Sequence, residues 1–331
     1  MSVRVAANPL YLSRLITSEK SLIAAIRRLS GRGRNKAVIR GIGDDCAVLR
    51  LFPDHELLVT TDFSIENVHF RRKWHPARSV GHRCLARGLS DIAAMGGEPL
   101  ACFLSLGLPP KLPQRWVDGF LQGLHRLAQT SGVQLAGGDT SAAPQITADI
   151  IVTGQVPRAQ AILRSGARPG DRIFVTGELG HSTAVLNRLF AGKRIRPSVS
   201  DRHFFPLPRL RVGAWLRARR LVTAMIDLSD GLSVDLAHIC EESRVSAVIK
   251  PSQLPVARDA SLDLALHGGE DYELLFTASA KAKIPKSVSG VKITEIGRIT
   301  RQKHYPRAIS VLDENGRERP LPPLAWQHFR R

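Results

Sequence analysis

The chain has 331 residues, 43% of them hydrophobic, which is enough for two globular domains with their own cores. Its formal net charge of +19 permits binding to polyanions, but there is no long basic block with interleaved aromatic residues of the kind that binds single-stranded nucleic acid. No apolar run is long enough to span a bilayer. The four scattered cysteines form no C-x-x-C pair, which favours a reducing cytoplasm over a zinc site or a disulfide framework.

The first half of the chain predicts strands and helices in mixed order. Residues 1–17 are expected to be a short extension, and a serine cap at Ser18 followed by helical spacing of apolar residues predicts a helix over 18–29. The next elements expected are strands at 37–51 and 56–65, a helix at 76–97, a strand at 99–109, a helix at 113–132, and strands at 133–141 and 146–156. This order indicates an α+β or mixed α/β layer.

A stretch rich in Pro, Gly and Arg, "PRAQAILRSGARPG" at 157–170, predicts a domain boundary, with domains at 18–157 and 158–331. The segment "RLRVGAWLRARR" at 209–220 predicts one amphipathic helix with a solvated arginine face. The other elements expected in this half are a strand and glycine turn at 171–180, a helix at 181–192, a strand, acidic turn and helix at 222–243, and strands at 247–250, 271–279 and 292–300.

Aspartates next to small or hydroxylated residues recur at the ends of the expected elements. They are Asp44, Asp45, Asp62, Asp91, Asp139, Asp227 and Asp230. They lie within apolar segments, which predicts partial burial, and buried acids need partners. Salt bridges to the many arginines are one explanation. A hard cation fits several such turns better, because Mg²⁺ takes oxygen ligands and shares them with substrate phosphates. So many turns favour more than one ion.

Glycine turns such as "GGDTS", "LSDGL" and "GGEDYELLF" bring backbone N–H groups close to these acids. Together with the aspartates they predict a polyphosphate held through magnesium. Neither a Walker A sequence nor a kinase glycine-rich loop is present, so a nucleotide enzyme of another architecture is expected.

Eight motifs carry a family resemblance. They are, in order, "GIGDDCAVL", "TTDFSIENVHF", "GLSDIAAMGGEP", "GGDTS", "RSGARPGD", "VTGELG", "IDLSDGLSVDLAHI" and "GGEDYELLFT". With them the chain closely resembles the thiamine-monophosphate kinase family of the aminoimidazole ribonucleotide synthetase-like (PurM-like) superfamily, from Ser18 to the terminal "WQHF". The resemblance implies a two-domain PurM-like architecture, in which the N-terminal domains of a homodimer pair into a β-barrel and the C-terminal domain is α/β.

The same resemblance implies ATP-dependent phosphorylation of thiamine monophosphate to thiamine diphosphate, with several Mg²⁺ ions, ATP as co-substrate and no membrane partner. The implied magnesium ligands are Asp45, Thr60, Thr61, Asp62, Asp91, Asp139, Asp227 and Asp230. The implied ATP contacts are Gly138, Asp139, Arg164 and Ser229, and the implied contacts to thiamine monophosphate are His69, Glu270 and Trp326. From the residues alone, His69 could equally pack beside Phe70, Arg164 could be a surface arginine, Trp326 could cover the core, and Glu270 could belong to a solvated turn.

Two positions depart from the family pattern. Asn67 stands where the family has Gly, and Asn tolerates a positive φ better than most residues, so the turn is expected to survive. Gly88 stands where the family has Asn, which is expected to loosen a helix turn without changing Asp91.

The expected chemistry is direct in-line transfer without a covalent nucleophile or a general base. Two unit anionic charges 4 Å apart repel by roughly 4 kcal/mol at an effective dielectric constant near 20, which metal ions must cancel. The acceptor phosphate needs no base, because the second pKa of a phosphate monoester is about 6. The alternatives are another ATP-using enzyme of the superfamily, such as a selenophosphate synthetase or a hydrogenase-maturation protein, and a basic nucleic-acid-binding protein on this scaffold. The cluster of carboxylates argues against a nucleic-acid-binding protein, because acids without a bound metal would repel phosphate.

Overall fold

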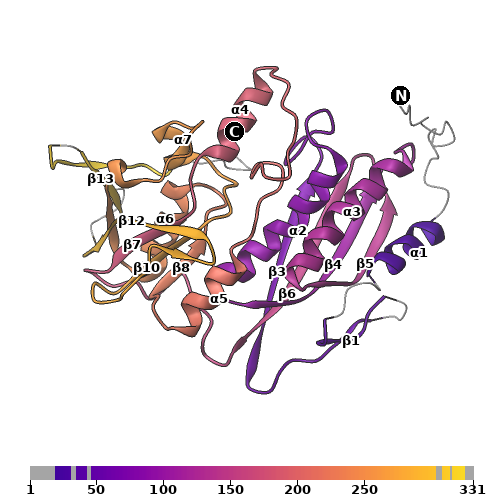
Figure 1. The fold of residues 1–331 in the computed structure, drawn as a ribbon, viewed down its shortest axis with the longest axis horizontal. Helices are drawn as coiled ribbons and strands as arrows, with labels where there is room; N and C mark the ends of the chain where they lie inside the picture. The colour runs from indigo at the N-terminus through magenta and orange to yellow at the C-terminus, as the bar shows by residue number, and fades with distance from the viewer. Residues whose placement is uncertain (1–18, 31–34, 43–45, 303–307, 314, 325–331) are drawn as a thin grey trace, which may run out of the picture.

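The computed structural model describes residues 19–30, 35–42, 46–302, 308–313 and 315–324, and it contains two large open sheets, one in each half of the chain (Figure 1). The elements of the first half are α1 (Glu19–Ser30), β1 (Val38–Arg40), β2 (Val48–Leu49), β3 (His55–Ile65), α2 (Ala77–Ala94), β4 (Glu98–Leu108), α3 (Gln114–Ser131), β5 (Gln134–Ala142) and β6 (Thr147–Pro157).

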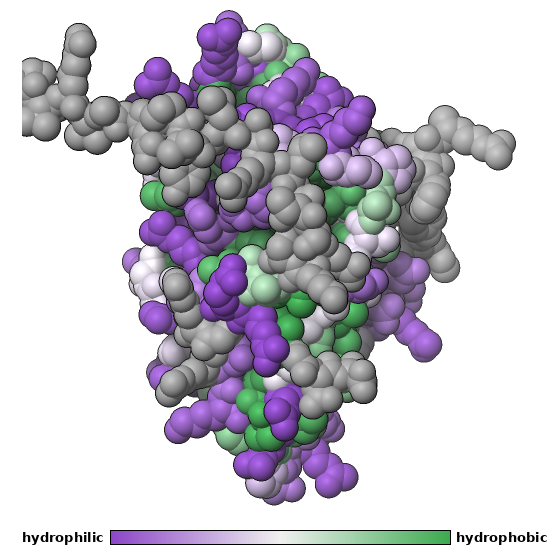
Figure 2. Space-filling view, turned by 90° about the vertical axis from the view of Figure 1, so that its right-hand side faces the viewer, coloured by the Kyte–Doolittle hydropathy of each residue, from purple (hydrophilic) through white to green (hydrophobic). Residues whose placement is uncertain are grey.

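The first sheet has the strand order β3-β6-β4-β5, in which only β4 and β5 run parallel. Helices α2 and α3 pack together against one of its faces (Figure 1). The core between them includes the fully buried side chains of Leu85 and Leu89 from α2, Phe120 from α3 and Ile150 from β6. From the side nearest α1 and β5, hydrophobic side chains show in the middle of the surface among hydrophilic ones (Figure 2).

The second half builds a mixed sheet with the order β14-β13-β9-β12-β7-β10-β8, and β11 pairs with β12. Its elements are β7 (Arg172–Thr176), α4 (His181–Phe190), α5 (Leu210–Ala218), β8 (Ala224–Asp227), α6 (Leu232–Ser243), β9 (Ser246–Ile249), a 3-10 turn η2 (Pro251–Gln253), α7 (Leu262–His267), β10 (Leu274–Ala278), β11 (Ser287–Val288), β12 (Val291–Thr300), β13 (Ile309–Leu312) and β14 (Glu318–Pro320). Helix α2 lies at the junction of the halves, where it contacts α5 and β8.

Most elements that the sequence predicted are present, and the mixed α/β class is confirmed. Helix α3 ends at Gly132, whose φ of 71° is the left-handed cap that favours glycine. The strand predicted at 37–51 is present only in part: among the residues of that range that the structure describes, β1 and β2 form a short antiparallel pair and the others lie outside strands. The predicted barrel does not appear in the single chain, whose large sheets are both open over the described residues.

Both departures from the family pattern have a structural explanation. Asn67 has a φ of 66°, so the turn is kept as expected. A Cβ built at Gly88 would lie 2.6 Å from Cγ2 of Val152, so the small size of glycine lets α2 lie close to β6.

The predicted arginine-rich helix forms as α5, but its arginine face is only partly solvated. Arg209, at its start, forms a buried ion pair with Glu273. Arg217, in its last turn, is 8% exposed in its side chain and pairs with Glu98 at 3.1 Å. The amphipathic pattern showed a helix but not that two of its arginines meet acids on other elements. No helix within the described ranges has both the length and the apolar character needed to cross a bilayer.

Candidate active site

An acidic cluster lies where the two halves of the chain meet. Strand β3 contributes Thr60 and Asp62, and α2 contributes Asp91. The Thr60 hydroxyl donates a hydrogen bond to Oδ2 of Asp91 at 2.5 Å. From the second half, Asp227 ends β8, and its Oδ2 accepts a hydrogen bond from Oγ of Ser90 at 2.7 Å. The Ser90–Asp227 bond therefore joins the two sets of carboxylates.

Burial and neighbouring acids raise the pKa values of carboxylates in this cluster. The pKa of Asp62 is raised to about 6, chiefly by burial and also by Asp91, Asp149 and Asp230, against the lowering effect of Arg87. The pKa of Asp227 is raised to about 7, chiefly by burial and also by Asp91. Neighbouring acids with raised pKa values repel one another when ionised, so the site has an excess of negative charge that a cation would neutralise.

Salt bridges do not account for the cluster. Among the ion pairs formed by described residues, none joins Asp62, Asp91 or Asp227 to an arginine or lysine. Within the same ranges, no three His, Cys, Asp or Glu side chains already form a complete metal-ligand set. Magnesium commonly completes its shell with waters and substrate phosphate oxygens, so this oxygen-only, acid-rich donor set fits that ion.

Two further predicted magnesium ligands, Thr61 and Asp139, do not join the cluster that contains Thr60. Thr61, the next residue of β3, is exposed and donates to Oδ1 of Asp149 at 2.7 Å. Asp139 on β5 is exposed, and its Oδ1 accepts a hydrogen bond from the Thr140 N–H at 2.8 Å. Asp45, also predicted as a ligand, lies outside the described residues. The structure therefore gathers Thr60, Asp62, Asp91 and Asp227, while Thr61 and Asp139 bond to neighbours of their own.

The residues predicted to contact ATP are spread around this cluster. Gly138 has a φ of 146°, and a Cβ there would lie 2.0 Å from the Leu104 carbonyl oxygen, so only glycine fits. Arg164 is exposed in the connection between the halves, and its charge lowers the pKa of Asp91 and of Asp227 against the larger effect of burial. Ser229 lies in the turn between β8 and α6, and its carbonyl accepts from the N–H of Glu270 at 2.8 Å.

The first turn of α6 contains an acid that the sequence did not single out. Asp235 is 1% exposed, and its Oδ2 accepts hydrogen bonds from the N–H groups of Asp230 and Gly231 at 3.2 and 3.0 Å. These bonds fix the conformation of the turn that carries Asp230. Its position in the first turn of a predicted helix was the available signal, since acids are favoured there.

Glu270 is held by two buried arginines of α2. Nη2 of Arg83 and Nη2 of Arg87 each lie 2.7 Å from its Oε1. Burial alone would raise the pKa of Glu270, but the two guanidinium groups outweigh it and hold that pKa below its usual range. Neither arginine was predicted from the sequence as part of the site. Their spacing of four residues, which places both on one side of the predicted helix, was the available signal.

His69 lies next to this ion-pair group. Its Nδ1 accepts a hydrogen bond from the Ile65 N–H at 3.0 Å, and it lines a small cavity together with Ser64, Arg83 and Arg87. His69 and Glu270, both predicted to contact substrate, are thus connected through the arginines. Trp326 lies outside the described residues.

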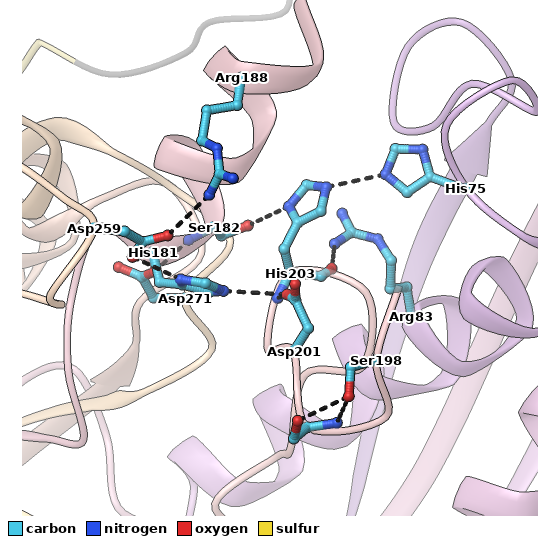
Figure 3. Close-up of polar contacts among 11 residues, drawn as sticks. His75, Arg83, His181, Ser182, Arg188, Ser198, Asp201, His203, Asp259 and Asp271 are labelled. Atoms are coloured by element: carbon cyan, nitrogen blue, oxygen red, sulfur yellow. Dashed lines mark hydrogen bonds and ion pairs between the residues drawn. The ribbon is translucent and has the colours of Figure 1, made fainter. Parts of the chain in front are cut away.

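A histidine contact also joins the halves (Figure 3). Nε2 of His75 lies 3.1 Å from Nε2 of His203, and Nδ1 of His203 lies 3.0 Å from Oγ of Ser182. Burial lowers the pKa of His75 to about 4 and that of His203 to about 3, so both rings are neutral near pH 7. Arg83 reaches the same segment and donates to the carbonyl oxygen of His203.

The fold and the acidic site define an AIR synthase related protein. The model of the AIR synthase related protein N-terminal domain matches residues 43–156, and that of the C-terminal domain matches residues 168–308. Within that class, the chain belongs to the thiamine-monophosphate kinase family. Thiamine-monophosphate kinase of Escherichia coli K12 is 39% identical over 277 residues, which cover 78% of this chain and 84% of that protein.

Solved structures agree with this assignment. The thiamine-monophosphate kinase of Stenotrophomonas maltophilia is 35% identical with a TM-score of 0.78, and the match covers 89% of this chain and 96% of that one. AaThiL complexed with AMPPCP and TMP is 29% identical with a TM-score of 0.74, and the match covers 98% of this chain and 100% of that one.

Proposed function

We propose that this protein transfers the γ-phosphoryl group of ATP to the phosphate of thiamine monophosphate and so forms thiamine diphosphate. The observation that carries the proposal is the Ser90–Asp227 bond, which joins carboxylates of both halves into one site in a chain of this family. Incubation of the purified protein with ATP, Mg²⁺ and thiamine monophosphate should yield thiamine diphosphate. Correctly folded protein that forms no product would refute the assignment.

We assign magnesium binding to the gathered set of Thr60, Asp62, Asp91 and Asp227, with Asp230 in the adjoining turn. Bound magnesium would neutralise and orient the phosphates of the two substrates. The raised pKa values of Asp62 and Asp227 support this role, because a bound cation offsets both causes: the burial of the ionised carboxylates and the repulsion from neighbouring acids. Asp45, Thr61 and Asp139 stay predictions as further ligands.

The protein's own groups would bind and orient the reactants without taking a proton. Arg164 would contact the ATP phosphates, Gly138 would allow close backbone approach, and Ser229 would contact ATP from the turn before α6. The acceptor oxygen is already ionised near pH 7, so no general base is required. His69 and Glu270 would contact thiamine monophosphate, and Trp326 stays a prediction for the same role.

We also propose that the chain forms a homodimer through the open face of its first sheet. Leu57, Val59 and Phe63 alternate along β3 with Thr60 and Asp62, and they are 47%, 63% and 56% exposed. Large apolar side chains in such a row favour burial against a second copy, as the predicted barrel requires. A cytoplasmic location, and a domain boundary at 157/158 between the two family matches, remain part of the proposal.

The alternatives are not favoured. A selenophosphate synthetase or hydrogenase-maturation activity would need closer relatives of those kinds, whereas the curated relatives at 34–39% identity are thiamine-monophosphate kinases. A nucleic-acid-binding role gives no reason for a cluster of carboxylates between the halves.

A further inference from the structure

The carboxylate of Glu270 is held at one oxygen by side chains from the other half of the chain. Arg83 and Arg87 lie four residues apart on α2, so both project from one side of that helix. Their Nη2 atoms converge on the same oxygen, Oε1, at 2.7 Å each. No hydrogen bond to Oε2 is present among the described residues, and the Glu270 side chain is 26% exposed. One oxygen is therefore fixed and the other remains accessible.

Each arginine is itself fixed at a second point. Arg83 also donates to the carbonyl oxygen of His203, and Arg87 donates through Nη1 to that of Phe63 at 2.8 Å. Their side chains are 4% and 10% exposed, so neither guanidinium is free to follow a moving carboxylate. Planar guanidinium groups bound at two points hold an acceptor in a defined orientation.

The backbone of Glu270 is also constrained. Its φ of 65° lies in the left-handed region, and its N–H donates to the Ser229 carbonyl. The next residue, Asp271, accepts hydrogen bonds from the N–H groups of Gly180 and Ser182 at 2.7 and 3.4 Å, at the start of α4. Figure 3 shows Asp271 beside Ser182. The segment that carries Glu270 is thus anchored in the second half, while its carboxylate is fixed by the first.

We infer that Arg83 and Arg87 are positioning residues for the acceptor substrate: they hold Oε1 of Glu270 across the junction of the halves, so that Oε2 accepts a hydrogen bond from an N–H donor of that substrate. The inference rests on the proposed function and deepens it. It predicts that the two arginines contribute to acceptor binding without touching the acceptor, and that ATP binding does not depend on them.

A purely structural clamp would hold the halves together without affecting either substrate. Substrate-specific measurements separate the two roles. Arg83→Met is the cleaner variant, because Arg87 also lies near Asp62 and so near the proposed metal site. Arg78→Met is the matched control, since Arg78 lies on the same helix and its exposed guanidinium bonds only Gln122 in the described part of the chain.

The experiment is calorimetric binding of thiamine monophosphate without ATP, together with steady-state kinetics. Arg83→Met and Glu270→Gln should each weaken thiamine monophosphate binding by about tenfold to a hundredfold, the loss typical of one hydrogen bond to a charged group. The KM for ATP should stay within about twofold, and Arg78→Met should match the wild type. The double variant Arg83→Met/Glu270→Gln should bind thiamine monophosphate no more weakly than the weaker-binding of the two single variants, because both changes remove the same positioned carboxylate.

Unchanged acceptor binding in Arg83→Met and Glu270→Gln, with only a lower melting temperature, would overturn the inference. So would an equal rise in the KM for ATP. If Arg83→Met does not fold, Arg83→Lys is used instead, because lysine keeps the positive charge and lacks the planar, two-pronged guanidinium group. Thiamine monophosphate binding between that of the wild type and that of Glu270→Gln supports the inference. Binding as strong as in the wild type contradicts it. A wild-type protein that binds thiamine monophosphate but makes no product would refute the proposed function and leave this binding test valid.

Discussion

Replacing Asp62 by Asn should stabilise the magnesium-free protein while it removes activity. The pKa of Asp62 is raised from 3.8 to about 6 by burial and by neighbouring acids. The folded state therefore disfavours its ionised form, so wild-type stability falls as pH rises from about 4 to 6 and remains reduced above that. Two pKa units correspond to roughly 3 kcal/mol, a net value that already includes the attraction to Arg87, so the expected gain at pH 8 is about 2–3 kcal/mol.

The assay is urea unfolding at pH 4.5 and pH 8 in the presence of a chelator. The variant should exceed the wild type in free energy of unfolding at pH 8, and the difference should shrink at pH 4.5, where Asp62 is largely protonated. Added Mg²⁺ should stabilise the wild type more than the variant, because the ion binds the ionised carboxylate. Asp118→Asn, on the exposed surface of α3, should show neither effect.

A variant that is less stable than the wild type at pH 8 without magnesium would refute this reasoning. It would mean that Asp62 is held by a favourable partner, as in a structural salt bridge. Retained kinase activity in Asp62→Asn would separately contradict its role as a metal ligand.

Three further predictions concern other parts of the molecule. Hydrogen bonding to Asp201 and Asp259 raises the pKa of His181 to about 9 against the effect of burial, so protonated His181 stabilises the fold fully below about pH 6.5 and this contribution is lost as pH rises through 9. His181→Gln should therefore lower the free energy of unfolding more at pH 6.5 than at pH 9.5. An equal loss at both pH values would contradict this prediction. Phe63→Asp should convert a dimer to a monomer in light scattering, while the control Val68→Asp, exposed beyond the end of β3, should not; a wild-type monomer would disprove the interface. Gly88→Ala should lower the free energy of unfolding by about 1–3 kcal/mol, because its Cβ would overlap Val152, and adding Val152→Ala should restore part of that loss; additive losses would argue against overlap.

The sequence predicted local structure well where local chemistry decides it. The apolar spacing and the Gly132 stop defined α3, and the tolerance of Asn67 for a positive φ was confirmed. The strand expected at 37–51 was confirmed only in part, because an apolar run between glycine turns does not reveal how much of it finds a partner strand; among its described residues, those of β1 and β2 pair.

The site could be predicted only in part, because its key contacts join distant segments. Resemblance pointed to Asp62, Asp91 and Asp227, and the structure places them in one cluster. No local pattern indicates that Arg83 reaches Glu270, a residue 187 positions later in the chain. The same limit explains why Arg217 was expected to be solvated, since its acid partner lies on another element.

The length of strand β3 determines which of its side chains lie on each face of the first sheet. Its side chains alternate between two faces: Thr60 and Asp62 point toward the acidic cluster, while Val59 and Phe63 are exposed on the other face. A single-residue deletion early in this strand would exchange the two sets, so the carboxylate would lie on the proposed dimer face and a phenyl ring in the proposed metal site. Such a deletion would then disrupt the proposed metal site and the proposed dimer interface together, whereas Asp62→Asn and Phe63→Asp are each directed at one of them.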